Sequence, residues 1–147
     1  MAPTSSAPVH VIPAAVSQSV DLKTLNIAAR SRSSNALAGH GSSQAGGVSE
    51  QQKVISISLD WLAGHFPDPD VIKIDIEGAE FEALAGAVTV LKRKRPLILC
   101  EVASTNSAQV GSLLLSMDYK ILDGEVPTAQ RTELSEAPWA TVAIPPA

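Results

Sequence analysis

Hydrophobic residues in the second half of the chain follow two periods, one typical of strands and one typical of helices. Short apolar runs at residues 71–76 and 97–102 predict two strands, and the helical spacing of apolar residues over 79–95 predicts a helix between them. Pro96 is expected to stop that helix, because proline lacks the backbone N–H that the next turn needs. Together these elements predict a βαβ unit.

The alternation continues toward the C-terminus. Residues 106–118 place apolar side chains on one side of a further helix, and apolar runs at 119–122 and 140–145 predict two more strands. Strands that alternate with helices are typical of an open α/β sheet with parallel neighbours. We therefore predict an α/β fold with a mostly parallel sheet, in which the C-terminal strand can pair antiparallel.

The first half of the chain is less regular. Residues 9–16 predict an edge strand, because Pro13 cannot donate to a central ladder, and residues 21–29 predict a weaker second strand. Residues 30–52 are rich in Ser, Gly, Ala and Gln without any period, which predicts a long flexible loop. A short strand is predicted at 53–58 and a helical turn at 58–66.

Charged residues interrupt the predicted strand that begins at residue 71. Because side chains alternate along a strand, Lys73, Asp75 and Glu77 share one face. The acids lie toward the carboxyl end of the strand, where open α/β sheets bind ligands, and Glu101 occupies the same end of the next strand. A structural interpretation remains open: Asp75 could pair with Lys73, and Glu77 and Glu80 could be acids favoured at a helix start by its dipole.

Composition limits the possible partners. The chain has 147 residues with 45% hydrophobic content, enough for one globular domain, and a net charge of −4. Nucleic acid and anionic membranes are therefore not expected as partners, because both are negatively charged. No apolar run approaches the roughly 20 residues of a membrane helix. Cys100 is the single cysteine, which fits a soluble protein in the reducing cytoplasm.

A series of motifs fills residues 71–102, which read VIKIDIEGAEFEALAGAVTVLKRKRPLILCEV. The sequence KIDIEGAE is followed by LAGA and then by RP with a glutamate five residues beyond the proline. This series resembles the signature half of the FkbM-type S-adenosylmethionine-dependent methyltransferases. Less specific similarity to the same family extends over residues 9–147, including the terminal strand at 140–145.

The resemblance implies a Rossmann-like methyltransferase fold that binds S-adenosyl-L-methionine across its strand ends and methylates hydroxyl groups of sugars or natural products. Asp75 matches the family's strand-end acid and is implied as the base, the acceptor anchor or a cofactor contact. Glu77 and Glu101 are implied as further catalytic residues, and Glu80 as an acceptor-binding residue. The residues expected to approach the adenine are Ala15, Val16 and Ser17.

The sequence departs from the family pattern in its first half. A complete member begins with a strand and a Gly-rich turn, followed by a strand that ends in a ribose-binding acid, and neither is recognisable here. We therefore interpret residues 1–52 as N-terminal strands with a flexible Ser/Gly-rich loop, and 53–147 as the C-terminal part of a truncated methyltransferase domain. The missing strands would leave a sheet edge open, so self-association or pairing with a missing N-terminal half is expected.

Two alternatives remain at this stage. The chain could be a non-catalytic remnant or interaction protein that retains half of the methyltransferase fold. Asp75, Glu77 and Glu101 could hold Mg²⁺, because carboxylates suit that ion, although no metal is part of the main prediction. Trp61 and Trp139 are interpreted as packing residues.

Overall fold

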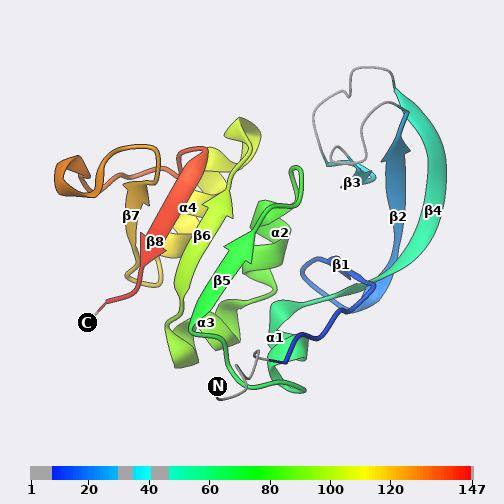
Figure 1. The fold of residues 1–147 in the computed structure, drawn as a ribbon, viewed down its shortest axis with the longest axis horizontal. Coiled ribbons are helices and arrows are strands. Elements are labelled where there is room, and N and C mark those ends of the chain that lie inside the picture. Colours follow the sequence, from blue (N-terminus) through cyan, green and yellow to red (C-terminus); the bar gives the residue numbers. More distant parts are fainter. Residues whose placement is uncertain (1–7, 30–34, 41–46, 147) are drawn as a thin grey trace, which may run out of the picture.

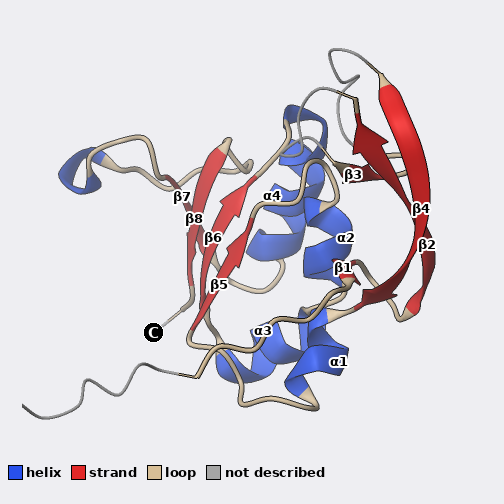
Figure 2. Ribbon diagram, turned by 45° about the vertical axis from the view of Figure 1, so that its right-hand side comes forward, coloured by secondary structure: helices blue, strands red, loops and turns tan. Residues whose placement is uncertain are grey.

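The computed structural model describes residues 8–29, 35–40 and 47–146 and shows a mixed α/β fold with two four-stranded sheets (Figure 1). The helices lie between the two sheets (Figure 2). None of the helices in the described ranges has the length and apolar character that crossing a membrane requires. The fold therefore places one layer of helices in contact with both sheets.

The C-terminal sheet is mixed. Its strands, in spatial order, are β5 (Val71–Ile74), β6 (Leu97–Glu101), β8 (Ala140–Ile144) and β7 (Lys120–Asp123). β5 and β6 are parallel, whereas β8 pairs antiparallel with both β6 and β7. The reversed C-terminal strand is thus confirmed. The expectation of a mostly parallel sheet is wrong, because β8 lies between β6 and β7, so its single reversal makes two of the strand pairs antiparallel.

The N-terminal sheet contains strands that the sequence pattern only partly indicated. Its spatial order is β1 (Ala15–Val16), β4 (Val48–Ile57), β2 (Asp21–Ala28) and β3 (Ala36–Leu37). β4 pairs antiparallel with β2 along most of its length and parallel with β1 at its end.

The predicted flexible loop over residues 30–52 is wrong for residues 36–37 and 48–52. Ala36–Leu37 and the start of β4 are strands, and residues 30–34 and 41–46 lie outside the described residues. Residues 48–53 of β4 are exposed and mostly polar, so they carry no hydrophobic period. Backbone pairing with β2 makes this segment a strand, and that pairing is invisible in a local pattern.

The predicted helix over residues 79–95 is two helices. They are α2 (Glu80–Ala85) and α3 (Val88–Lys94). The break has a physical cause: the Asp60 carboxylate accepts the N–H groups of Thr89 (3.0 Å) and Val90 (2.8 Å), which caps a new helix start at α3. Asp60 itself lies in α1 (Leu59–Ala63), and its own N–H donates to the Gly86 carbonyl at 2.8 Å. These contacts from α1 therefore stabilise two separate helices instead of one continuous helix.

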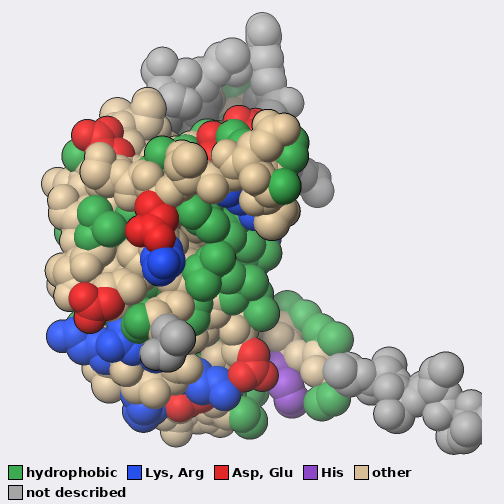
Figure 3. All heavy atoms as spheres, turned by 90° about the vertical axis from the view of Figure 1, so that its left-hand side faces the viewer, with side chains coloured by type: hydrophobic (Ala, Val, Ile, Leu, Met, Phe, Trp, Pro, Cys, Tyr) green, Lys and Arg blue, Asp and Glu red, His purple; other side chains and the backbone are tan. Residues whose placement is uncertain are grey.

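One face of the C-terminal sheet packs on the helices, which also include α4 (Ser107–Leu115). The buried strand residues on this face include Ile72, Ile74 and Ile98. Residues at the alternating positions, such as Val71 (52% exposed) and Ile144 (38% exposed), point to the opposite face. Figure 3 shows hydrophobic side chains together with acidic and basic ones on that side of the molecule. The helices thus cover only one side of this sheet.

Gly86 lies where the chain between α2 and α3 meets the N-terminal sheet. A Cβ atom at this position would lie 2.5 Å from the Ser17 carbonyl oxygen and 2.9 Å from the Gln18 Cα atom. Because both neighbours are backbone atoms, they cannot move aside without separating α2 from β1. We expect Gly86→Ala to lower the free energy of unfolding by about 1–3 kcal/mol, as overpacking of a core does. Urea unfolding measures this change.

Gly64→Ala is the matched control for that substitution. A Cβ atom at Gly64 would meet only the Trp61 carbonyl oxygen at 3.2 Å, and the Gly64 φ of −77° suits alanine. We expect the control to unfold within about 0.5 kcal/mol of wild type. Equal stability of Gly86→Ala and Gly64→Ala would contradict the close packing of α2 on the N-terminal sheet.

Candidate functional site

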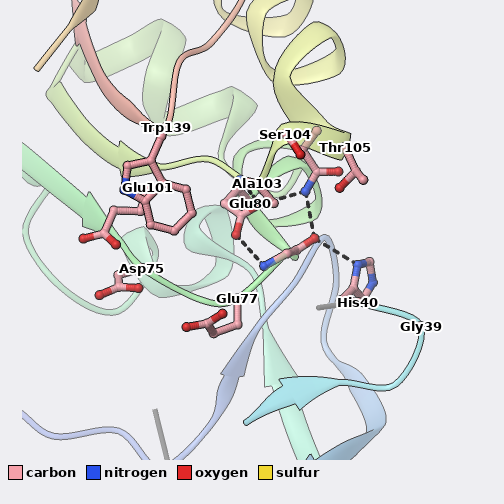
Figure 4. Close-up of a pocket in the computed structure, with 12 residues that line it drawn as sticks. Gly39, His40, Asp75, Glu77, Glu80, Glu101, Ala103, Ser104, Thr105 and Trp139 are labelled. Carbon is pink, nitrogen blue, oxygen red and sulfur yellow. Dashed lines mark hydrogen bonds between the residues drawn. The ribbon is translucent and has the colours of Figure 1, made fainter. Parts of the chain in front are cut away.

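A cavity of about 590 Å³ opens at the carboxyl ends of β5 and β6 (Figure 4). Segments from both halves of the chain surround it. The lining residues are Gly39, His40, Asp75, Glu77, Gly78, Glu80, Glu101, Ala103, Ser104, Thr105, Asn106 and Trp139. The structure therefore brings Asp75, Glu77, Glu80 and Glu101, which the sequence singled out, around one space.

Asp75 and Glu101 share one lysine at this rim. The Lys73 Nζ atom lies 3.1 Å from the Glu101 Oε1 atom and 3.7 Å from the Asp75 Oδ2 atom. The hydrogen bond to Glu101, with a smaller effect of Asp75, raises the pKa of Lys73. The lysine is therefore charged at neutral pH and offsets part of the negative charge of the cavity. All three side chains are well exposed, so these ion pairs contribute little to folding stability.

Asp75 lies beyond the strand rather than inside it. β5 ends at Ile74, and the Asp75 side chain is 54% exposed. The interpretation of Asp75 as a residue within the strand is therefore wrong, and water solvates its carboxylate. A carboxylate with this exposure stays solvated and needs no ion pair to offset a desolvation cost. It can contact a ligand that enters the cavity.

Glu80 is buried, with 1% exposure, and its carboxyl group is fully engaged. One oxygen accepts the Gly78 N–H, and the other accepts the Asn106 Nδ2–H at 2.7 Å and the Ala103 N–H at 3.4 Å. Glu80 thus joins the turn before α2 to the segment after β6. These contacts favour a structural role, and the acceptor-binding role implied by the resemblance stays a prediction.

The turn at Glu77 and Gly78 has an unusual backbone. Glu77 has a φ of 50° and Gly78 a φ of 99°, both in the left-handed region that a glutamate adopts only at an energetic cost. The Gly78 carbonyl accepts the Asn106 Nδ2–H at 2.8 Å, in addition to the bond that its N–H makes to Glu80. Side chains therefore hold the peptide groups before and after Gly78, and Glu77 in this turn lines the cavity.

The N-terminal half contributes a second set of contacts. The His40 ring lies 3.0 Å from the Glu82 Oε1 atom through Nε2 and 3.2 Å from the Gly78 carbonyl oxygen through Nδ1. The Ser17 hydroxyl donates to the Glu82 Oε2 atom at 2.6 Å. This last bond, together with His40 and Lys23, lowers the pKa of Glu82.

The sign of this pKa shift has a consequence for stability. A carboxyl group whose pKa is lower in the folded chain stabilises the fold at pH values above its ordinary pKa, and that stabilisation is lost as the pH falls through the lowered pKa. The contact between Glu82 and the N-terminal half is therefore complete at neutral pH and weakens only in acid.

Several residues of the site carried no usable signal in the sequence. His40 and Glu82 are 42 positions apart, and Ser17 and Glu82 are 65 apart, so no local motif relates them. Trp139 is 56% exposed and lines the cavity, so its interpretation as a packing residue is wrong. It follows a loop without regular structure, where no periodicity indicates which way a side chain points.

The residues expected near the adenine lie elsewhere. Ala15 and Val16 form β1 and do not line the cavity, and Ser17 is buried with its hydroxyl bound to Glu82. These residues do not fit an adenosine-binding role at the cavity, and no glycine-rich turn after a strand lines it in the described part of the chain. Their assignment to a cofactor stays a prediction.

The acids are not arranged as a metal site. Within residues 8–29, 35–40 and 47–146, no group of three His, Cys, Asp or Glu side chains has a geometry that could hold a metal ion. The Mg²⁺ alternative therefore gains no support. The neighbouring Cys100 thiol is no nucleophile, because burial raises its pKa to about 12.

The chemistry of the cavity follows from these groups. Asp75, Glu77 and Glu101 present carboxylates that can accept hydrogen bonds or a proton from a hydroxyl group. Trp139 offers an exposed ring as an apolar wall, and Ser104 and Thr105 add hydroxyl groups (Figure 4). The arrangement suits a small polar molecule with several hydroxyl groups.

Comparisons with known proteins gave one match. A family model described as the methyltransferase FkbM domain matches residues 4–125. No curated protein and no solved structure matches the chain. The family match includes the carboxylates of the cavity but ends before Trp139 and β8.

Proposed function

Because the chain belongs to the methyltransferase FkbM domain family, we propose that it methylates a hydroxyl group of a sugar or natural product and that the cavity holds this acceptor. The family match supports methyltransferase activity in general. Methyltransferases of this kind usually take the methyl group from S-adenosylmethionine, and we propose the same donor here. The family also suggests a Rossmann-like fold, and we propose that the C-terminal sheet and its helices form one half of it.

The observation that carries this proposal is the gathering of carboxylates at the ends of β5 and β6. Asp75 is exposed to the cavity, and among the described residues its only ion pair is a 3.7 Å contact with Lys73, so its oxygens can accept a hydrogen bond from the acceptor hydroxyl. Asp75 would hold that hydroxyl and take its proton as the oxygen attacks. Glu101 is bound to Lys73 at 3.1 Å, which fixes its carboxylate beside Asp75. Positioning of this kind accounts for a large part of catalysis in a displacement reaction.

Bound S-adenosylmethionine would supply a methyl group activated by a positively charged sulfur. The residues of this chain would orient the acceptor and accept its proton. The exposed Trp139 ring would cover the apolar face of a sugar or of a fused-ring natural product, and would exclude water there.

A second candidate function is a non-catalytic protein that keeps half of the fold. One observation favours it: Ala15, Val16 and Ser17 do not reach the cavity, and the described part of the chain shows no cradle for an adenosine. Such a chain would bind a hydroxylated ligand or a protein partner without methyl transfer.

Isothermal titration with S-adenosylhomocysteine separates the two functions. The enzyme hypothesis expects measurable heat and a rise in melting temperature, because a ligand that binds only the folded state stabilises it. Absence of both effects at millimolar ligand would contradict methyl transfer by this chain alone and support the non-catalytic alternative.

We further propose that the chain is cytoplasmic, because Cys100 is free and buried.

We also propose that a strand of another chain pairs with the free edge of β5. β5 pairs with β6 alone among the described strands, and Val71 at its start is 52% exposed. An open edge of this kind favours self-association. Light scattering tests it, and a monomer at all concentrations would contradict it.

A further inference from the structure

His40 lies between two groups that can only accept hydrogen bonds. Its Nδ1 atom is 3.2 Å from the carbonyl oxygen of Gly78, and its Nε2 atom is 3.0 Å from the Glu82 Oε1 atom. The Glu82 carboxyl group is ionised at neutral pH, because the hydrogen bond from Ser17 lowers its pKa. Neither neighbour can therefore donate a proton to the ring.

The number of ring protons decides which of these contacts can exist together. A neutral imidazole carries one N–H, so it can donate to Glu82 or to Gly78 but not to both. The imidazolium carries two and satisfies both acceptors. After loss of one proton, the remaining N–H is expected to stay on Glu82, because a hydrogen bond to an ionised group is roughly twice as strong as a neutral one. A lone pair on Nδ1 would then face the Gly78 carbonyl.

His40 contacts the carbonyl of Gly78, the residue that follows Glu77 in the turn at the cavity. Gly78 has a φ of 99° and the preceding Glu77 a φ of 50°, so this turn needs external contacts to persist. Asn106 and Glu80 supply two of these contacts from the C-terminal half, and His40 supplies a third from the N-terminal half (Figure 4). His40 therefore links the N-terminal half to the turn that forms part of the cavity wall.

We propose that doubly protonated His40 is a positioning residue that fixes the Glu77–Gly78 turn at the cavity, and that loss of its proton releases this turn. The effect of this turn on acceptor binding rests on the proposed function, in which Glu77 faces the acceptor. The coupling between the ring proton and the turn does not depend on that function.

The charged groups around His40 are consistent with this role. Glu82 and Glu80 come from α2, and Glu77 comes from the turn that His40 contacts. Lys23 from β2 acts on Glu82. Asn106, which shares the Gly78 carbonyl with His40, has no charge and does not titrate. The ring therefore lies among carboxyl groups, and a second ring proton would be offset by their negative charge.

A pH titration of the whole chain by NMR tests the coupling. The Ala79 amide nitrogen belongs to the same peptide group as the Gly78 carbonyl, so its shift reports the hydrogen bonding of that carbonyl. We expect the Ala79 nitrogen and the His40 ring to follow one titration curve between pH 5 and 8. An Ala79 signal that stays constant over this range, or follows a different curve, would overturn the proposal.

Two variants sharpen the test. His40→Gln is expected to abolish the titration of Ala79, because glutamine cannot change its charge. His65→Gln is the matched control: the His65 ring packs against the Trp61 ring and its Nδ1 atom lies 2.8 Å from the Trp61 carbonyl, away from the cavity, so the Ala79 curve should stay unchanged. A persistent Ala79 titration in His40→Gln would contradict the role of His40. The wild-type curves decide the question even if a variant does not fold, and no cofactor or acceptor is needed, so failure of the proposed function would not affect the result.

Discussion

Replacement of Asp75 by asparagine is expected to lower the rate of methyl transfer by roughly a hundredfold, the usual contribution of a positioned general base. Asparagine keeps the shape of the side chain but cannot take a proton from the acceptor hydroxyl. Because Asp75 is 54% exposed, the free energy of unfolding should change by no more than about 0.5 kcal/mol. The rate is measured as S-adenosylhomocysteine released from S-adenosylmethionine in the presence of a pool of mono- and disaccharides.

Asp70→Asn is the control for this substitution. Asp70 lies at the other end of β5, is 87% exposed and pairs with Lys94 at 2.8 Å. It is an exposed, ion-paired acid next to the same strand, but it does not line the cavity. Its replacement should leave the rate unchanged. If instead Asp75→Asn unfolds and keeps full activity per folded molecule, Asp75 is structural and its contact with Lys73 explains its presence.

Replacement of Glu80 by alanine is expected to cause the largest loss of stability. The carboxyl group of this buried residue accepts hydrogen bonds from Gly78, Asn106 and Ala103, and alanine would leave these donors without that acceptor. A buried donor without a partner costs about 1–3 kcal/mol, so we expect a total loss of roughly 3 kcal/mol in the free energy of unfolding. Urea unfolding followed by circular dichroism measures it.

Glu77→Gln is the matched control, because Glu77 lies in the same turn with an exposed side chain. Its unfolding free energy should stay within about 0.5 kcal/mol of wild type. A Glu80→Ala variant as stable as the control would show that the engaged carboxyl group does not hold the turn, and would reopen its prediction as an acceptor-binding residue.

The sequence predicted those parts of the fold that depend on local pattern. The apolar runs that became β5 and β6 were recognisable because alternate side chains of each strand pack on the helices. The same alternation placed Lys73, Asp75 and Glu101 on one rim, as their mutual contacts confirm. The presence of these strands and the face that each side chain shares therefore followed from side-chain periodicity, whereas the end of β5 at Ile74 did not.

Features that depend on contacts between distant segments were not predictable in this way. The break between α2 and α3 depends on Asp60, which lies 29 positions before Thr89 and reaches it only in the folded chain. The polar start of β4 becomes a strand only through its pairing with β2. His40 reaches the cavity because β3 places it beside α2. In each case the deciding interaction joins residues that no local pattern relates.

We propose that the cavity at the ends of β5 and β6 is the active site of a methyltransferase. Mapping of backbone NMR shifts during titration with S-adenosylhomocysteine tests it most directly. We expect the largest changes in residues 75–78 and 101–106, the two segments that contribute most of the cavity lining. Absence of changes in both segments at saturating ligand, or changes confined to residues 15–17, would contradict it.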